Sequence, residues 1–249
     1  MSGTFRITYE NGKIVKHPVE EAPKKENPMR QLIRTVRHEA RQVGWFVRGE
    51  VDAQRLADLF PPRLLSDADR LKPVYDSYIK EISTDDMAVS WETSRLLYAA
   101  VKLKRPKTML DLGSGFSSYV LRIAAIDNHN DALVYSVEDN EFWLGKTRAF
   151  LDAHGVGSAN LISWDKFQKE NKLKFDLIFH DLGSMDTRAA ALPYVLSLLN
   201  KGGAVVLDDM HKVLYHRAAE REVKKAGLTL YSIRKHTLDE IGRFAEVAL

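Results

Sequence analysis

The stretch from Thr108 to Leu121 constrains the fold more than any other part of this chain. Its sequence, TMLDLGSGFSSYVL, starts as a short apolar run, breaks on two glycines one residue apart and continues with apolar residues at helical spacing. This pattern predicts a buried strand, a tight turn and the start of a helix. Because glycine has no Cβ, backbone N–H groups near Gly113 and Gly115 can approach a ligand closely. The stretch therefore predicts a nucleotide-binding crevice.

The residues beside these glycines argue against a ligand held by its pyrophosphate. A dinucleotide-binding turn has a third glycine, and the corresponding position here is Ser118. Asp111, two residues before Gly113, can accept hydrogen bonds from a cationic or hydroxylated group. The turn therefore suits a positively charged ligand, and a glycine turn that serves packing alone is the simpler alternative.

Composition limits the classes of protein to which the chain can belong. Its 249 residues are enough for one large domain with an appendage. The absence of cysteine excludes disulfides, thiolate zinc sites and cysteine nucleophiles. No apolar run is long enough to span a membrane and the N-terminus does not resemble a signal peptide, so we expect a cytoplasmic protein with no membrane partner.

The N-terminal residues differ in charge from the rest of the chain. The net charge is +3, and the first fifty residues alone carry a surplus of four positive charges. Phe5–Glu10 and Lys13–Lys16 alternate around Asn11-Gly12, which predicts a hairpin, and residues 18 to 28 resemble an exposed linker. Such a hairpin is marginally stable alone. We therefore expect it to dock on another surface, and a second copy of the chain, in a homodimer, is one candidate.

Helical patterns follow this linker. Apolar residues recur at helical spacing from residue 29 to about 46, and four arginines form a stripe on another face of the same helix. The stripe could contact RNA, but we favour a solvated face because no aromatic residues interleave to stack on bases. Further helices are predicted over residues 52 to 60, 63 to 82 and 91 to 103. We divide the chain into a mainly helical N-terminal extension, residues 1 to 84, and a main domain, residues 85 to 249.

The main domain alternates strands and helices. Beyond the first strand, apolar runs predict parallel strands at residues 132 to 138, 161 to 164, 175 to 181 and 204 to 209. Two last strands, residues 228 to 234 and 244 to 249, should be antiparallel neighbours. The prediction is an α/β, doubly wound, Rossmann-like sheet of five parallel strands closed by an antiparallel hairpin.

Acidic residues follow the predicted strands where sites on such sheets gather, at the carboxyl edge. Glu138 and Asp139 end the second strand, where a carboxylate can accept hydrogen bonds from ribose hydroxyls. Asp181 ends the fourth strand, and Asp208 and Asp209 end the fifth. Three carboxylates at one edge repel each other unless a cation bridges them, and ligation by oxygen alone suits Mg²⁺.

Asp-x-Gly-x-Gly after a strand, followed by this order of elements, resembles the class I S-adenosylmethionine-dependent methyltransferases over residues 85 to 249. The resemblance implies a cofactor site whose parts come from the ends of successive strands. Met87, Val89 and Ser90, ahead of the sheet, are expected near the cofactor or in an ordinary loop and helix cap. The implied cofactor-binding residues are Asp111, Gly113, Ser114, Gly115, Ser117, Glu138, Asp139, Trp164, Asp165 and Asp181, of which Trp164 and Asp165 are expected beside adenine.

The acids after the fourth and fifth strands resemble those of catechol-type, cation-dependent O-methyltransferases. This resemblance implies Asp181, Asp208 and Asp209 as metal ligands. Those enzymes carry a lysine three residues after the first metal-binding Asp, where this chain has Ser184. Among nearby bases we favour His211, acting with Asp181, over His180, which is expected to point into packing.

These observations predict methyl transfer from S-adenosylmethionine to a hydroxyl or carboxyl group of a small molecule or peptide, assisted by Mg²⁺. The chain lacks the Asn/Asp-Pro-Pro-aromatic loop that holds planar amino groups in many N-methyltransferases, which favours oxygen as the acceptor atom. Two alternatives stay open. One is a nicotinamide-dependent oxidoreductase, and the other is a non-catalytic module that binds RNA or a partner through its basic N-terminal helix.

Overall fold

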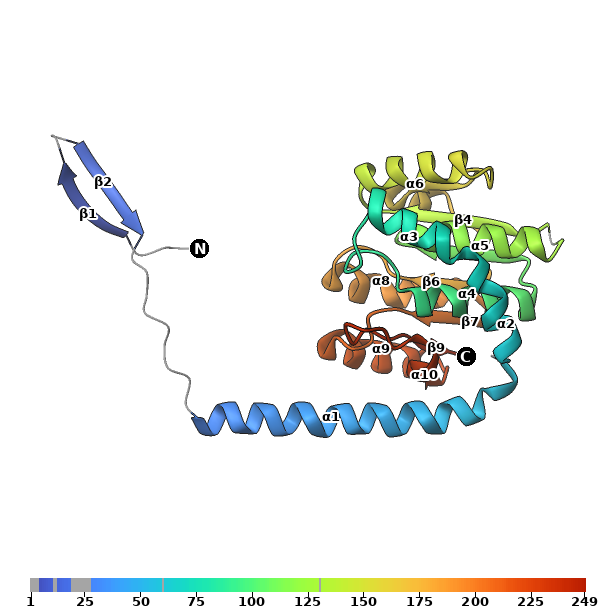
Figure 1. Cartoon of the computed structure of the whole chain (residues 1–249), viewed down its shortest axis with the longest axis horizontal. Helices are drawn as coiled ribbons and strands as arrows, with labels where there is room; N and C mark the ends of the chain where they lie inside the picture. Colours follow the sequence, from blue (N-terminus) through green and yellow to red (C-terminus); the bar gives the residue numbers. More distant parts are fainter. Residues whose placement is uncertain (1–4, 11–12, 19–27, 60, 130) are drawn as a thin grey trace. The chain divides into compact units, whose positions relative to one another are not determined.

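The computed structural model describes residues 5–10, 13–18, 28–59, 61–129 and 131–249. These residues form two compact units, one before Trp45 and one from Trp45 to Leu249. The first unit holds β1 (Phe5–Glu10) and β2 (Lys13–Pro18), which pair antiparallel and confirm the predicted hairpin (Figure 1). The predicted Asn11-Gly12 turn and most of the predicted linker lie outside the described residues.

Helix α1 (Pro28–Arg55) is longer than predicted. The sequence predicted separate helices that ended near residue 46 and began again at residue 52. The helix continues because a glycine costs only about 1 kcal/mol in a helix interior, which packing can offset. At Gly49 an added Cβ would lie 3.4 Å from the Cβ of Arg234, an ordinary van der Waals distance, so α1 runs directly beside the segment that follows β8. There Asp52 accepts a hydrogen bond from the backbone N–H of Ser232 at 2.9 Å.

The helix predicted over residues 63 to 82 is divided. It consists of α2 (Pro62–Asp67), a 3-10 turn (Ala68–Leu71) and α3 (Lys72–Glu81). The break falls at the 3-10 turn, just before Pro73 in the first turn of α3, because proline cannot donate the backbone hydrogen bond of a continuous helix. Helix α4 (Trp91–Lys104) begins at a cap, where the Ser90 hydroxyl accepts a hydrogen bond from the backbone N–H of Thr93 at 3.1 Å.

The sheet of the second unit confirms the predicted topology. Its strand order is β5-β4-β3-β6-β7-β9-β8, with β3 to β7 parallel and β9 antiparallel to both neighbours. The fifth parallel strand begins at Leu199 rather than at residue 204, and its pairing with β6 is irregular in this added part. The strands are β3 (Thr108–Leu112), β4 (Leu133–Glu138), β5 (Leu161–Ser163), β6 (Phe175–His180), β7 (Leu199–Leu207), β8 (Leu230–Ser232) and β9 (Glu246–Ala248).

Helices cover both faces of this sheet (Figure 1). Residues of α4, α5 and α6 share one apolar core, and residues of α7, α8 and α9 share a second. None of the helices that the structure describes is long and apolar enough to cross a bilayer. The remaining helices are α5 (Phe116–Asp127), α6 (Glu141–Ala153), α7 (Trp164–Glu170), α8 (Met185–Ser197), α9 (Val213–Lys225) and α10 (Arg234–Thr237).

A buried arginine links the first core to the sheet. The guanidinium of Arg122, on α5, donates hydrogen bonds to the Ser118 carbonyl at 3.0 Å, the Ser136 hydroxyl at 2.7 Å and the Ala159 carbonyl at 3.1 Å. Burial raises the pKa of Asp111, and the positive charge of Arg122 acts in the opposite direction. Arg122 therefore joins three segments and partly compensates a buried acid.

We expect Arg122→Met to lower the free energy of unfolding by about 3 kcal/mol, because it removes the hydrogen bonds to two carbonyls and a hydroxyl and takes away a positive charge near the buried Asp111. Urea denaturation followed by circular dichroism measures the change. The control is Arg221→Ala, which removes an exposed ion pair with Glu222 and should cost less than about 1 kcal/mol. Equal losses in the two variants would contradict the assigned role.

Candidate functional site

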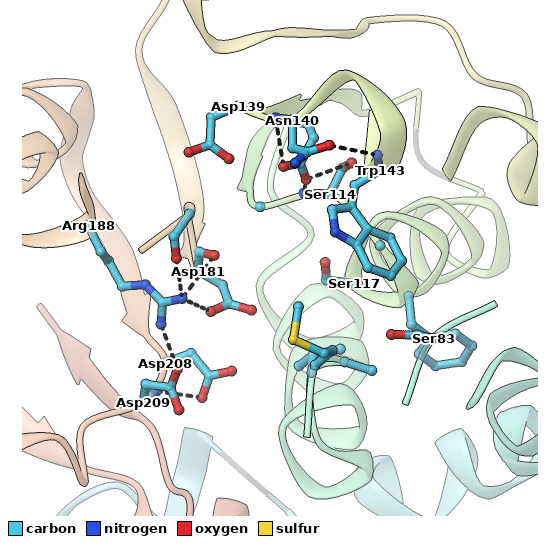
Figure 2. A pocket seen from close by; sticks show the side chains of 18 of the residues that line it. Ser83, Ser114, Ser117, Asp139, Asn140, Trp143, Asp181, Arg188, Asp208 and Asp209 are labelled. Carbon is cyan, nitrogen blue, oxygen red and sulfur yellow. Dashed lines mark hydrogen bonds and ion pairs between the residues drawn. The ribbon is translucent and has the colours of Figure 1, made fainter. Parts of the chain in front are cut away.

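A cavity of about 460 Å³ opens at the carboxyl ends of the parallel strands (Figure 2). It receives residues that follow β3, β4, β6 and β7, which confirms that the strand ends meet at one place. Of the residues predicted from the sequence, the cavity is lined by Met87, Val89, Gly113, Ser114, Gly115, Ser117, Glu138, Asp139, Asp181, Asp208 and Asp209. It is not lined by Asp111, Trp164, Asp165 or His211.

The turn after β3 requires glycine for two reasons. Gly113 has a φ of +91°, which other residues rarely adopt, and an added Cβ would overlap the backbone carbonyl of Asp181. The two strand ends are joined here, since the backbone N–H of Asp181 donates to the Leu112 carbonyl at 2.7 Å. Glycine thus lets the β3 and β6 ends converge on the cavity.

Asp111, which the sequence analysis expected to contact the cofactor, lies outside the cavity lining. This carboxylate is fully buried and accepts hydrogen bonds from the hydroxyls of Ser117 at 2.8 Å and Ser118 at 2.5 Å. Burial raises its pKa. Its oxygens already have partners inside the protein, and Asp111 therefore holds the first turn of α5 rather than facing a ligand. Ser118 also accepts from the backbone N–H of Gly115 at 3.2 Å, which gives the serine at the third-glycine position a structural role.

Glu138 connects β4 to the glycine turn. One carboxylate oxygen accepts from the backbone N–H of Ser114 at 2.8 Å, and the other accepts from the backbone N–H of Asn140 at 3.2 Å. Burial and the neighbouring Asp139 raise the pKa of Glu138 to about 7. The carboxylate is therefore fixed at the cavity wall in an orientation set by backbone groups.

An aromatic residue that the sequence analysis missed lines the cavity. Trp143, on the first turn of α6, faces it beside Asn140, whose side-chain oxygen accepts from the Trp143 backbone N–H at 3.3 Å (Figure 2). Trp164 instead packs against Phe167 and Tyr194, at ring distances of 6.0 Å in both cases. Asp165 is exposed. The signal for Trp143 was available in the sequence: a helix cap at Asn140, directly after β4, places residue 143 near the carboxyl edge.

The three predicted metal ligands, Asp181, Asp208 and Asp209, line the same cavity, and Arg188 lies among them (Figure 2). Arg188, on α8, is 4% exposed in its side chain and pairs with Asp181 at 2.5 Å and with Asp209 at 3.0 Å. Its guanidinium also donates to the Asp181 backbone carbonyl at 3.1 Å. Burial acts to lower the pKa of Arg188, but the two carboxylates outweigh it and the pKa is raised.

This arrangement does not fit the predicted Mg²⁺ ion. Within the described ranges, no three His, Asp or Glu side chains are grouped in a way that could hold a metal ion. One carboxylate oxygen of Asp181 and one of Asp209 are already paired with Arg188. Asp208 stands next to this pair, and burial together with Asp209 raises its pKa to about 6.

The two histidines near the acids have different surroundings. His180 is fully buried, its Nε2 lies 2.9 Å from the Arg188 carbonyl, and burial lowers its pKa to about 4. It therefore serves packing, as predicted. His211 lies with Nδ1 3.5 Å from an Asp209 oxygen and does not line the cavity. Ser184 caps α8, where its hydroxyl accepts from the Thr187 backbone N–H at 3.2 Å.

Comparisons with solved structures establish the fold. The chain aligns with the O-methyltransferase from Bacillus cereus in complex with SAH at 15% identity and a TM-score of 0.51, over 82% of this chain and 98% of that one. It aligns with the O-methyltransferase TomG from Streptomyces achromogenes in complex with SAM at 19% identity and a TM-score of 0.50, over 80% of this chain and 95% of that one. It aligns with cofactor-bound Rv0187 from MTB at 19% identity and a TM-score of 0.53, over 81% of this chain and 96% of that one. No protein-family model and no curated protein matches the sequence. The chain has the Rossmann-like fold of class I methyltransferases.

We expect Gly113→Ala to lower the free energy of unfolding by about 3 kcal/mol, since it combines a strained φ with a backbone collision. The control is Gly227→Ala, which has a similar φ of +75° but open space around the added Cβ. It should cost about 1 kcal/mol. Urea denaturation of both variants measures the difference, and equal costs would show that the approach of Asp181 to Gly113 is not tight.

Proposed function

We propose that this chain transfers the methyl group of S-adenosylmethionine to an oxygen atom. The observation that carries the proposal is the buried carboxylate of Glu138, held at the wall of a cavity beside the glycine turn of a methyltransferase fold. A carboxylate in that place can accept hydrogen bonds from both hydroxyls of a ribose. The backbone from Gly113 to Ser117 is positioned for the amino-acid part of the cofactor.

The charge of the lining supports a cationic cofactor. The cavity lining has an excess of acids, because two arginines, Arg188 and Arg243, stand against six acids, which are Asp86, Glu138, Asp139, Asp181, Asp208 and Asp209. Such a wall attracts a sulfonium and an α-amino group and repels pyrophosphate. The alternative of a nicotinamide-dependent oxidoreductase is therefore disfavoured. The same acids would repel an ionised carboxylate, so we favour a hydroxyl over a carboxyl group as the methyl acceptor.

Positioning supplies most of the catalysis in this reaction. The acceptor oxygen attacks the methyl carbon in line with sulfur, and the carbon–sulfur bond breaks with its electron pair left on sulfur. The hydroxyl proton passes to a base. Asp181 lines the cavity and His211 does not, so the geometry favours the carboxylate of the two proposed catalytic residues.

The N-terminal extension is proposed to select the acceptor, a small molecule or a peptide. Two of its residues, Tyr78 and Ser83, line the cavity together with Met87. Burial raises the pKa of Tyr78, so its phenol stays neutral and can donate a hydrogen bond. We keep the homodimer as a proposal that rests on the small size of the β1–β2 hairpin.

Isothermal titration with S-adenosylhomocysteine tests the cofactor site. We expect binding to the wild-type chain that strengthens about tenfold from about pH 6 to about pH 8, because the ionised fraction of Glu138 rises through its pKa of about 7 and only that form accepts from both ribose hydroxyls. Glu138→Gln should bind more weakly and lose this pH dependence. Absence of heat with folded wild-type protein, for both S-adenosylmethionine and S-adenosylhomocysteine, would refute the proposed function.

A second titration decides which tryptophan contacts adenine. The structure favours Trp143, whereas the sequence favoured Trp164 with Asp165. We expect Trp143→Ala to weaken S-adenosylhomocysteine binding about tenfold, in line with the energy of stacking a base on an aromatic ring. Trp164→Ala, provided that it folds, is the matched control and should bind as the wild type does. If Trp164→Ala weakens binding and Trp143→Ala does not, the sequence-based prediction that Trp164 contacts adenine is favoured instead.

A further inference from the structure

The acids at the end of β6 and β7 are compensated by a side chain of the protein itself. Carboxylates brought close together disfavour their own ionisation unless positive charge is supplied. Arg188 supplies it from the first turns of α8, and its backbone N–H donates to the Ser184 carbonyl at 2.8 Å. Side chains on a helix lean toward its N-terminus, which directs Arg188 toward the carboxyl edge of the sheet.

The contacts of Arg188 use the atoms that a metal ion would need. One terminal nitrogen pairs with Asp181, the other pairs with Asp209, and the guanidinium also donates to the Asp181 and Gly183 carbonyls at 3.1 and 3.4 Å. A divalent ion would require carboxylate oxygens to converge on one point at about 2.0–2.6 Å. The guanidinium instead pairs with one oxygen of Asp181 and one of Asp209, so an ion could draw the two carboxylates together only by displacing Arg188.

The surroundings fix Arg188 in this position. Its side chain is buried and its guanidinium carbon lies 5.8 Å from the centre of the Tyr215 ring. The backbone carbonyl of the same residue lies 2.9 Å from Nε2 of His180, which ties the helix to the end of β6. Arg188 is therefore buried in the site and has partners at its backbone carbonyl and at both terminal nitrogens, unlike an exposed surface arginine.

We propose that Arg188 is the resident cation of this site, standing where a divalent metal ion stands in cation-dependent O-methyltransferases, so that the chain works without metal. The part of this inference that concerns methyl transfer rests on the proposed function. Arg188 acts as a positioning residue, because it holds Asp181 and Asp209 in place. The acceptor then need not chelate an ion through two neighbouring oxygens. A single hydroxyl that donates to a carboxylate of the wall is sufficient.

The test is binding of Mn²⁺ alone, followed by electron paramagnetic resonance. We expect the wild-type chain and the exposed control Arg221→Ala to leave Mn²⁺ free in solution. Arg188→Ala should gain a Mn²⁺ site, because it leaves the acids without their cation, and the double variant Arg188→Ala/Asp209→Asn should lose it again. Arg188→Lys keeps a positive charge and should stay free of Mn²⁺.

Thermal unfolding keeps the proposal testable if Arg188→Ala is unstable. Mn²⁺ should raise the unfolding temperature of Arg188→Ala and leave that of the wild type unchanged, since only the variant has a site for the ion. Wild-type binding of Mn²⁺ that Asp209→Asn abolishes would overturn the proposal. Failure of Mn²⁺ to bind or stabilise the folded or partly folded Arg188→Ala variant would also overturn it.

A separate titration distinguishes this proposal from the proposed function. Wild-type binding of S-adenosylhomocysteine should be the same in EDTA and in excess Mg²⁺. If no binding is seen in either, the proposed function fails while the Mn²⁺ experiments still decide the role of Arg188. If binding requires Mg²⁺, the cofactor site stands and the role assigned to Arg188 is wrong.

Discussion

The burial of negative charge at one edge of the sheet is the constraint on which this structure depends. Three of the acids there are compensated by different kinds of group. Asp111 accepts hydrogen bonds from two serine hydroxyls, and Glu138 accepts them from backbone N–H groups. Asp181 forms an ion pair with the guanidinium of Arg188. The three acids therefore differ in whether they can contact a ligand in the cavity. Asp111 is closed to ligands, whereas Glu138 and Asp181 remain at the cavity wall, and the cavity owes its negative lining to this difference.

The topology followed from the sequence because its signals reinforce one another. Apolar runs of strand length alternated with helical patterns, and a parallel sheet brings the ends of such strands to one edge. Glu138 and Asp181 could be placed at that edge from their positions at the strand ends alone. The predicted strands therefore brought the acids together correctly, even where individual boundaries were wrong, as in the irregular part of β7.

The direction of a side chain was harder to predict. In β3 the residues from Met109 to Leu112 are all buried, so the strand has no polar face and its alternation does not show where Asp111 points. Arg188 posed a similar problem, because an arginine on a helix ordinarily signals exposure. Its burial depends on acids that are 7 and 21 residues away in the chain. Only the folded arrangement reveals that pairing.

The charge of Arg188 has a further consequence for the proposed reaction. The positive charge of a sulfonium disappears as the methyl group leaves it, so a wall with uncompensated acids would stabilise the bound cofactor more than the transition state. Interactions that favour the ground state in this way do not accelerate the reaction. Arg188 pairs with both Asp181 and Asp209, and its single positive charge reduces the negative charge of the wall at these two acids. In the proposed reaction, Arg188 thus limits this effect at Asp181, the acid assigned to the acceptor, whereas Glu138, the acid assigned to the ribose, is held by backbone N–H groups.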